Sequence, residues 1–312
     1  MNDKAITGFA PASVANVGLG FDFMGFALQG AGDRVTIAFG KDGYATKIKM
    51  SGKFGSLIPD DPLQNTAGVA VNAMLKAKGL EGLKLEISLE KNLPLSSGLG
   101  SSASSAAAAL IALNELLGNP FTIEGLIPFA MEGERAACGT AHADNVAPSL
   151  LGGFVIIRSY NPLDIIRIKC PDDLFCAVIH PHIQVKTSDA RRILKRDIPL
   201  SDVTRQCANV SGFVTGLLRE DYDLIGRSMH DLLAEPQRIN LIPGFAQVKQ
   251  AVLESGAIGC GISGSGPSIF ALCRGEMNAG IIAKAMKNSL SETGLDSDSF
   301  ISSLNAKGAS VV

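Results

Sequence analysis

The chain has 312 residues, with 28 basic and 30 acidic side chains that leave a formal charge of −2. This balance supplies no field that would recruit nucleic acid or an anionic membrane, and aromatic residues, at 5 %, are too few for a base-stacking surface. With 46 % hydrophobic residues the chain can bury the core of one large domain or two ordinary ones. Its 34 glycines are about a dozen more than the ~7 % average gives, which indicates many sharp turns or close backbone approaches.

The six cysteines, at positions 138, 170, 176, 207, 260 and 273, form no C-x-x-C pair and have no histidine spaced to complete a zinc site. We therefore predict free thiols in a reducing compartment, the cytoplasm. The N-terminus enters a strand-like segment without the pattern of a signal peptide. No apolar run approaches the roughly 18–20 residues of a membrane span.

In the first half of the chain, alternating apolar and polar residues predict strands at 35–39 and 85–90. Alternation indicates sheets with one polar face, hence antiparallel or mixed pairing, unlike the continuous apolar strands of a doubly wound parallel fold. Small residues on many faces of 101–117 indicate a central helix that is closely packed on several sides. The other predicted helices are 65–78 and 122–137, the latter bent or shortened by Pro128.

A strand at 152–157 and a turn at Asn161-Pro162 mark a boundary between predicted domains 1–160 and 161–312. The fold class is α+β, in two halves that share a cleft. The elements predicted beyond the boundary are a strand at 175–179, a helix at 188–195 with Thr187 or Ser188 as N-cap, helices at 202–219, 222–233 and 243–255, two strands joined by a glycine loop within 258–270, a helix at 277–290 and a strand near 300–304.

A glycine block from Pro94 to Ala103 connects the strand at 85–90 to the Ala-rich helix. A glycine loop that enters a helix N-terminus offers free N–H groups and the positive end of the helix dipole, so it can hold a phosphate. Serine hydroxyls at the helix start can bond phosphate oxygens or reach Mg²⁺. The G-x-G-x-x-A match to a dinucleotide fingerprint is discounted because the preceding strand alternates with charges and lies about seven residues away. A simple tight turn is the structural alternative.

Two further glycine blocks flank this one in the sequence. The first runs from Pro11 to Gly25 and places Asn16 and Asp22 among apolar residues, where polar groups need partners or a ligand. The last, 261–268, has three glycines in six residues, which lets the backbone pass close to another group. A turn and a hairpin without function are the alternatives for these two blocks.

Together, the three blocks resemble the signature motifs of the GHMP small-molecule kinases, in the same order and over essentially the whole chain. The detail is most similar to the members that phosphorylate homoserine. The resemblance implies a two-domain α+β fold, with an N-terminal ribosomal-protein-S5-like domain 2 and a C-terminal ferredoxin-like domain. The phrases typical of these members are Asn16-x-Gly18-x-Gly20-Phe21-Asp22-x-x-Gly25, His142-Ala143-Asp144-Asn145-Val146-Ala147-Pro148, Thr187-x-x-x-Arg191 and Glu235-Pro236-x-Arg238.

The resemblance implies transfer of the γ-phosphate of ATP to a hydroxyl, with Mg²⁺, in threonine biosynthesis. Glu134 and one loop serine, Ser102 in preference to Ser101, would be the metal ligands, because few hard oxygen ligands suit Mg²⁺ on nucleotide phosphates. Glu132 fits an exposed helix acid equally well, and only the spacing to His142 selects Glu134. The implied ATP-binding residues are Asn65 on the adenine side and Pro94, Ser97, Gly98, Leu99, Gly100, Ser101, Ser102 and Ala103.

The acceptor, homoserine, is a zwitterion with a terminal hydroxyl. Its carboxylate suits the planar guanidinium groups of Arg191 and Arg238. Its ammonium needs acceptors, which Asn16 and Asp22 supply. His142, Asn145 and Thr187 complete the implied substrate-binding set, with Asn145 nearest the reacting hydroxyl. A homodimer is a further expectation from the family.

Asn145 stands where related kinases for mevalonate or galactose carry an aspartate, and an amide cannot accept a full proton at neutral pH. The segment Pro11–Val14 also lacks the positive residue of those relatives. We therefore hypothesise catalysis without a side-chain base, by positioning and electrostatic stabilisation. Asp22 as a weak base is the open alternative.

Other functions fit parts of the sequence. The alternatives are a GHMP kinase for another small hydroxyl acceptor, a catalytically silent relative that binds ATP or a metabolite, and a dinucleotide-binding oxidoreductase. His180 and His182 lie on one strand face as a possible metal pair, but no third ligand is evident and we interpret them as structural. Glu132 and Glu134 are two positions apart on a helix and do not face each other, which argues against paired carboxylates for hydrolysis.

Overall fold

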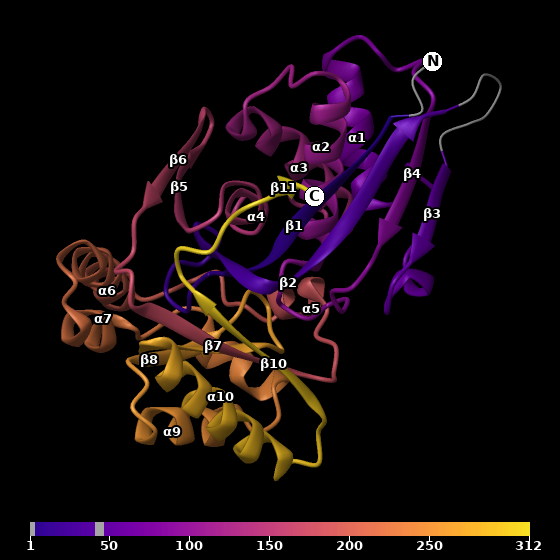
Figure 1. Ribbon diagram of the computed structural model, residues 1–312. Helices are drawn as coiled ribbons and strands as arrows, with labels where there is room; N and C mark the ends of the chain where they lie inside the picture. Colours follow the sequence, from indigo (N-terminus) through magenta and orange to yellow (C-terminus); the bar gives the residue numbers. More distant parts are fainter. Residues whose placement is uncertain (1–3, 41–46) are drawn as a thin grey trace.

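The computed structural model describes residues 4–40 and 47–312. Its larger sheet has strand order β11-β1-β2-β4-β3, and β5 and β6 extend from the start of β2 (Figure 1). β3 is parallel to β4 and the other pairs are antiparallel, which confirms mixed pairing. The strands of this sheet are β1 (Ala5–Ala15), β2 (Met24–Phe39), β3 (Lys47–Ser51), β4 (Leu85–Glu90), β5 (Phe154–Tyr160), β6 (Leu163–Ile168) and β11 (Ser310–Val311).

Helices pack on one face of this sheet, with α2 at the centre. α2 (Ser101–Leu116) buries 14 of its 16 residues, because alanines let β1, β2 and three helices approach it closely. The confirmed prediction of a central helix therefore rests on side-chain size rather than on an amphipathic pattern. Its helical neighbours are α1 (Thr66–Ala77), α3 (Ile123–Cys138) and α4 (Val146–Leu151), and the short η1 (Gly55–Leu57) precedes α1.

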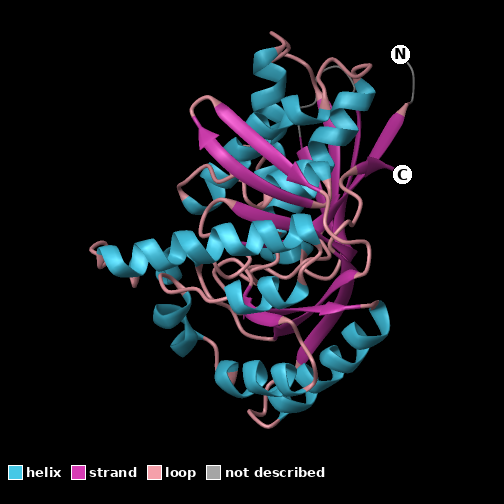
Figure 2. Cartoon of the chain, turned by 90° about the vertical axis from the view of Figure 1, so that its left-hand side faces the viewer, coloured by secondary structure: helices cyan, strands magenta, loops and turns pink. Residues whose placement is uncertain are grey.

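The smaller sheet is antiparallel, with strand order β10-β7-β9-β8. α9 and α10 cover one face, where they share an apolar cluster with β7, β8 and β9. Figure 2 shows the two sheets with their helices arranged around them. The elements of this half are β7 (Leu174–Pro181), β8 (Gly259–Ile262), β9 (Ile269–Arg274), β10 (Ser297–Ser303), α5 (Thr187–Arg192), α6 (Leu200–Arg219), α7 (Tyr222–Ser228), α8 (Glu235–Arg238), η2 (Ile239–Leu241), α9 (Phe245–Glu254) and α10 (Glu276–Ser291).

A third apolar cluster joins the two sheets. Phe26 on β2 meets Phe270 on β9 edge to face, with ring centroids 6.1 Å apart, and stacks on Phe154 of β5. Phe213 of α6 packs against Phe154 in the same cluster. β6 belongs to the larger sheet although it lies beyond residue 160, and β11 returns to that sheet from the C-terminal half. The division at residue 160 therefore stays a proposal.

Most predicted elements occur, with differences at their ends. The helix predicted over 222–233 stops at Ser228, because the Asp231 carboxylate accepts the N–H groups of Leu233, Ala234 and Glu235 and so starts a separate turn, α8. The predicted N-cap of α5 is wrong: Lys186 occupies that position and Thr187 is already helical. α3 continues through Pro128.

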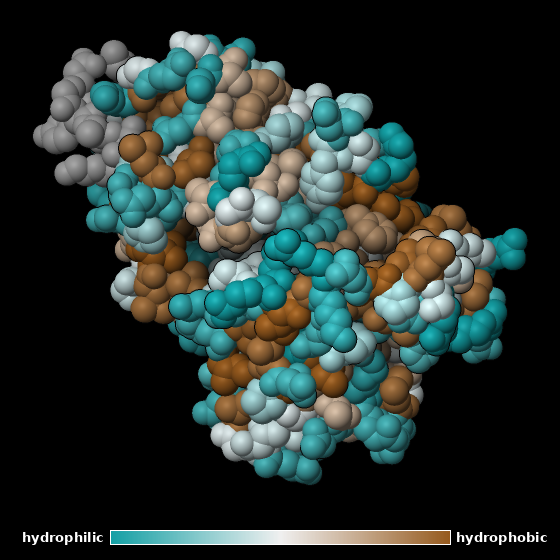
Figure 3. Space-filling view, turned by 180° about the vertical axis from the view of Figure 1, so that it is seen from behind, coloured by the Kyte–Doolittle hydropathy of each residue, from teal (hydrophilic) through white to brown (hydrophobic). Residues whose placement is uncertain are grey.

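On the face opposite to that in Figure 1, hydrophilic and hydrophobic residues are interspersed (Figure 3). Within residues 4–40 and 47–312, no helix combines the length and apolar character needed to cross a membrane. All six cysteines lie in these ranges and are free thiols, as predicted.

Candidate phosphate and acceptor site

The middle glycine block forms a loop that ends in the N-terminus of α2. Gly100, the N-cap, has φ +63° and offers no side chain to cap the helix, so the first N–H groups of α2 keep their capacity to bind an anion. A Cβ on Gly100 would lie 2.1 Å from Ser13 Oγ and 2.8 Å from Asn145 Oδ1. Glycine is required at this position both for its backbone conformation and for this close approach.

Four groups from three parts of the chain bind the loop carbonyls from behind. Ser268 Oγ donates to Ser97 O at 2.6 Å, Ser263 Oγ to Gly98 O at 2.6 Å, and Ser13 N to Leu99 O at 3.1 Å. Lys91 Nζ donates to Ser101 O at 2.6 Å. In a planar trans peptide the C=O and the next N–H point in opposite directions. Holding these carbonyls therefore turns the following N–H groups to the other side of the loop.

The third glycine block supports this loop. Gly98 lies so close to the turn at 263–266 that a Cβ would meet Ser263 O at 2.4 Å and Gly266 O at 2.9 Å. Gly264 N donates to Ala15 O at 2.9 Å, and Asn16 Nδ2 donates to Gly264 O at 2.9 Å. The three blocks, far apart in sequence, thus form one contact region, and their glycines permit the close backbone approaches that the sequence indicated.

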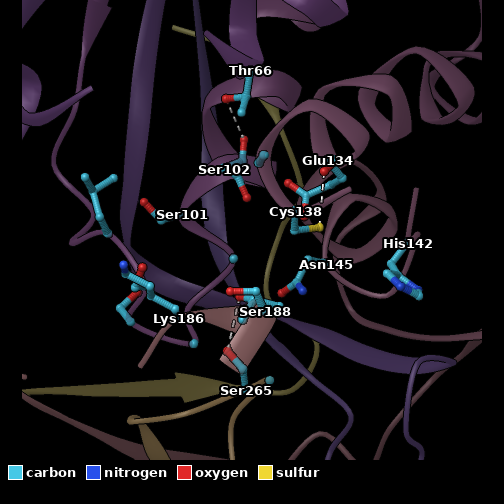
Figure 4. A pocket seen from close by; sticks show the side chains of 18 of the residues that line it. Thr66, Ser101, Ser102, Glu134, Cys138, His142, Asn145, Lys186, Ser188 and Ser265 are labelled. Carbon is cyan, nitrogen blue, oxygen red and sulfur yellow. Dashed lines mark hydrogen bonds between the residues drawn. The ribbon is translucent and has the colours of Figure 1, made fainter. Parts of the chain in front are cut away.

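A cavity of about 560 Å³ opens on this region. Figure 4 shows Ser102 and Glu134 beside each other on its wall, with Asn145 and His142 farther along and Ser188 and Ser265 opposite Ser102. The predicted site residues that line it are Asn16, Asp22, Asn65, Ser97, Gly98, Gly100, Ser101, Ser102, Glu134, His142, Asn145, Thr187, Arg191 and Arg238.

Three predicted ATP-binding residues, Pro94, Leu99 and Ala103, do not line the cavity. Leu99 and Ala103 are fully buried in core clusters, so they shape the loop from inside. Asn65 is on the wall, but its side chain is used within the protein: Oδ1 accepts from Ala67 N as the N-cap of α1, and Nδ2 donates to Pro59 O. The geometry therefore gives no free Asn65 amide for adenine.

Glu134 carries an unsatisfied group of the kind that a cation requires. The residue is 7 % exposed, and its buried Oε1 has no hydrogen-bond partner. Burial raises the pKa of Glu134, while Ser102 and Lys91 oppose that rise. A buried carboxylate oxygen without a partner fits a metal ion bound with nucleotide phosphates.

The structure also separates the two candidate serines. Ser101 is buried and its hydroxyl donates to Leu93 O at 3.2 Å, inside the protein. Ser102 is half-buried on the cavity wall, next to Glu134. The preference for Ser102 over Ser101 as a metal ligand is therefore supported by which hydroxyl remains available.

The sequence did not predict the buried ion pair, Lys91–Asp33, that lies beneath the loop. Lys91 is 1 % exposed and Asp33 is fully buried, and Lys91 Nζ donates to Asp33 Oδ2, Ser101 O and Ser105 Oγ. Burial lowers the pKa of Lys91, whereas Asp33 raises it. Lys91 also reaches the cavity wall, so it brings positive charge to the base of the phosphate loop.

Two residues predicted to accept the substrate ammonium are bound to protein groups. Asp22 accepts hydrogen bonds from Arg191 Nη1 and Nη2, each at 2.8 Å. Asn16 Oδ1 accepts from Asp22 N at 2.9 Å, and its Nδ2 is bound to Gly264 O. Asn16 and Asp22 thus organise the loop and hold Arg191.

Arg191 and Arg238 come together around an aromatic ring that sequence reasoning did not single out. Their guanidinium carbons lie 5.4 Å and 5.2 Å from the centroid of Phe21, which both cations contact. Arg238 is 3 % exposed and donates through Nε to Ala190 O and through Nη1 to Gly264 O, both at 3.1 Å. Because Asp22 already pairs with Arg191, the uncompensated positive charge on this wall is that of Arg238, and the remaining N–H donors of the two guanidinium groups suit a carboxylate.

Asn145 lies between the acceptor side and the phosphate loop. Ser13 Oγ donates to its Oδ1 at 2.8 Å, which leaves the Nδ2 donor for another group. His142 places Nδ1 3.9 Å from Asp22 Oδ2, and its buried Nε2 has no partner. Burial lowers the pKa of His142, with Asp22 opposing.

Asp144 is a cavity-lining residue that the predicted site omitted. It is 4 % exposed, and burial, followed by the charges of Asp22 and Glu134, raises its pKa to about 7. Asp144 lies within the sequence motif His142–Pro148, and this position could have identified it as a site residue.

Thr187, on the exposed first turn of α5, has Oγ1 3.4 Å from Ser265 Oγ. The neighbouring Lys186 is a further cation on the wall. His180 and His182 lie outside this cavity. In the described ranges, no group of three or more His, Cys, Asp or Glu side chains could hold a metal by itself.

Comparison with family models matches two segments of the chain. Residues 65–153 match the N-terminal domain of GHMP kinases, and residues 213–292 match the GHMP kinase C-terminal domain. The first segment contains the phosphate loop and Glu134, and the second contains Arg238 and the third glycine block.

Relatives and solved structures match over nearly the whole chain. A homoserine kinase from Chloroherpeton thalassium is 51 % identical over 99 % of this chain and 100 % of its own length, and one from Chlorobaculum tepidum is 49 % identical over 99 % and 98 %. The crystal structure of homoserine kinase from Cytophaga hutchinsonii has a TM-score of 0.95 at 48 % identity, covering 100 % of this chain and 98 % of the other. Mevalonate kinase of L. major, at 19 % identity and a TM-score of 0.69 over 96 % of both chains, shares the fold.

Proposed function

The chain belongs to the GHMP kinases, and from this we infer that it phosphorylates the hydroxyl of L-homoserine with ATP, giving O-phospho-L-homoserine and ADP, a step of threonine biosynthesis. Membership in a kinase family implies the use of ATP. One observation carries the assignment: Asn145, from the acceptor phrase, is held by Ser13 against Gly100 of the phosphate loop. A hydroxyl beside Asn145 is therefore also beside a bound phosphate.

The reaction requires few covalent tasks from the protein. The homoserine oxygen forms a bond to the γ-phosphorus while the bond to the β–γ bridging oxygen breaks, and the hydroxyl proton passes to water. The N–H groups of Gly98, Gly100, Ser101 and Ser102 stabilise charge on the phosphates, whereas that of Leu99 is bound to Ser97 Oγ at 3.2 Å within the loop. Lys91 and Lys186 add positive potential. Their fixed orientation means that little reorganisation is needed when charge shifts to the leaving group.

We propose that Ser102 and Glu134 hold Mg²⁺. The unpartnered Glu134 Oε1 and the available Ser102 hydroxyl fit such an ion. When bound, Mg²⁺ supplies charge neutralisation for the phosphate oxygens.

On the acceptor side, Arg238 and Arg191 would bind the substrate carboxylate near Phe21. Because Asp22 is occupied by Arg191, Asp144 is the better acceptor for the substrate ammonium, with His142 and Thr187 on the adjoining wall. An ammonium ion at this site would stabilise the charged form of Asp144.

Catalysis is proposed to need no side-chain base. Both carboxylate oxygens of Asp22 accept hydrogen bonds from Arg191, so neither is held ready for the substrate hydroxyl. Asn145→Ala should lower kcat strongly by misplacing the hydroxyl. Asp22→Asn should weaken homoserine binding without removing a limb of the pH–rate profile, and loss of a limb in Asp22→Asn alone would favour the base mechanism.

The decisive test is ADP release with Mg·ATP in the presence of homoserine, mevalonate, galactose or shikimate. We expect stimulation by homoserine. Stimulation only by another acceptor would identify a different GHMP kinase, and nucleotide binding without turnover would identify a silent relative. We also propose that the protein is a homodimer and that it is cytoplasmic. Light scattering of the purified protein would check the dimer.

A further inference from the structure

His180 is buried behind the phosphate loop and has no part in the mechanism proposed above. It lies on β7, is 3 % exposed, and its Nδ1 is 3.1 Å from Ser268 Oγ. Ser268, itself fully buried, lies in the third glycine block and binds Ser97 O through both Oγ, at 2.6 Å, and N, at 3.2 Å. His180 is thus one hydroxyl away from the loop that faces the cavity.

The hydrogen-bond arithmetic fixes the tautomer of this histidine. A serine hydroxyl has one proton, and Ser268 donates it to Ser97 O. Ser268 Oγ must therefore be the acceptor toward His180, which requires the proton on His180 Nδ1. This tautomer follows from two successive contacts, His180 to Ser268 and Ser268 to Ser97.

Burial, more than the charged groups that face it, keeps the His180 ring neutral. His182 lies 6.1 Å away between ring centroids, and Asp298, opposite His180 on β10, binds His182 Nε2 at 3.0 Å and Lys53 at 3.7 Å. Burial, followed by His182, lowers the pKa of His180 to about 4, with Lys53 assisting and with Asp298 and a hydrogen bond to the backbone of Ser97 opposing. Near neutral pH the ring is therefore uncharged, and its single N–H decides what it can donate to.

We propose that His180 is a positioning residue for the nucleotide phosphates: its Nδ1–H fixes the Ser268 hydroxyl on the Ser97 carbonyl, which turns the Gly98 N–H toward the cavity. The last step follows from the planarity of the Ser97–Gly98 peptide. The proposal rests on the proposed function only in taking the loop as a phosphate site, and it does not depend on the acceptor.

Two isosteric variants test the position of the donor. Asn at position 180 can place its N–H where Nδ1 lies, whereas Gln places it near Nε2. We expect His180→Gln and Ser268→Ala to raise the ATP dissociation constant, measured without acceptor, about tenfold, as expected for the loss of one buried hydrogen bond. His180→Asn should stay within about twofold of wild type. His182→Asn, two residues along the chain and half-exposed, is the control.

Kinetics and spectroscopy separate positioning from general damage. Where homoserine turnover is present, His180→Gln should raise KM for ATP and leave KM for homoserine unchanged. ¹⁵N NMR of histidine-labelled protein should show His180 with its proton on Nδ1. An Nε2–H tautomer, equal effects of Asn and Gln, or parallel changes in both KM values would overturn the proposal. Absence of homoserine turnover with intact ATP binding would refute the proposed function alone.

Discussion

The buried Lys91–Asp33 pair allows a quantitative prediction. Replacing Lys91 with Met retains most of the side-chain volume but removes the cation that Asp33 Oδ2 and Ser101 O contact. Removing one partner of a buried pair costs about 3–5 kcal/mol, because the other charge stays buried. Asp33 keeps Asn92 N at 2.9 Å, Leu93 N at 3.1 Å and Ser105 Oγ at 2.7 Å. Because these bonds still stabilise the Asp33 carboxylate, we expect the loss in the free energy of unfolding to lie near the lower end of that range, about 3 kcal/mol.

Chemical denaturation followed by circular dichroism measures this loss, with the exposed Lys84→Met as the matched control. The double variant Lys91→Met/Asp33→Asn should recover at least about 2 kcal/mol relative to additivity, since neither charge is then left alone. ATP affinity should fall in Lys91→Met because Ser101 O loses its ammonium donor. A Lys91→Met loss within about 1 kcal/mol of the control, or additive effects in the double variant, would refute the reasoning.

Glu134→Gln should lower kcat/KM for ATP at least about a hundredfold. It should not lower the melting temperature, because an amide removes the penalty of a buried charge. A lower melting temperature with retained activity would contradict this. The pKa of Asp144 is raised from 3.8 to about 7. At pH values between these two, the native state therefore holds a proton that the unfolded state has released, and the free energy of unfolding falls as the pH rises. Asp144→Asn should remove this pH dependence, so above pH 7 its free energy of unfolding should lose about 4 kcal/mol less than that of the wild type, as unfolding titrations would measure. The same pH dependence in both proteins would refute the shift. Gly100→Ala would bring a Cβ within 2.1 Å of Ser13 Oγ and should lower activity about a hundredfold or more. Gly118→Ala imposes the same left-handed backbone strain, at φ +79°, but meets no atom within 4 Å, so it should retain activity in the same assay.

Local patterns were sufficient to predict the central features of the fold. The alanine run of α2 and the alternation in β4 each describe one element and its burial, so no distant residue was needed. Close approach at the glycine blocks was also predictable, because a backbone rich in glycine can approach another backbone closely. Gly98 does so against the backbone of Ser263, and Gly100 comes equally close to the side chains of Ser13 and Asn145.

Pairings set by strand register were not predictable. Lys91 follows an alternating strand and resembles a solvated charge, yet the pairing of Arg34 with Glu90 brings Asp33 and Lys91 to the same end of the sheet. Sequence also could not tell whether a polar side chain binds a ligand or the protein. Asn65 is an example, since the amide predicted to contact nucleotide caps a helix.

The loop carbonyls are held by groups from β1, from the end of β4 and from the turn between β8 and β9, so the nucleotide site exists only while both sheets are folded. Folding of the whole chain and nucleotide binding are then linked equilibria. A nucleotide at a hundred times its dissociation constant adds about 2.7 kcal/mol to the free energy of unfolding, and this increment applies to the smaller sheet as much as to the larger one. In a cell, the nucleotide concentration would thus set the population of locally opened molecules and their exposure to proteases.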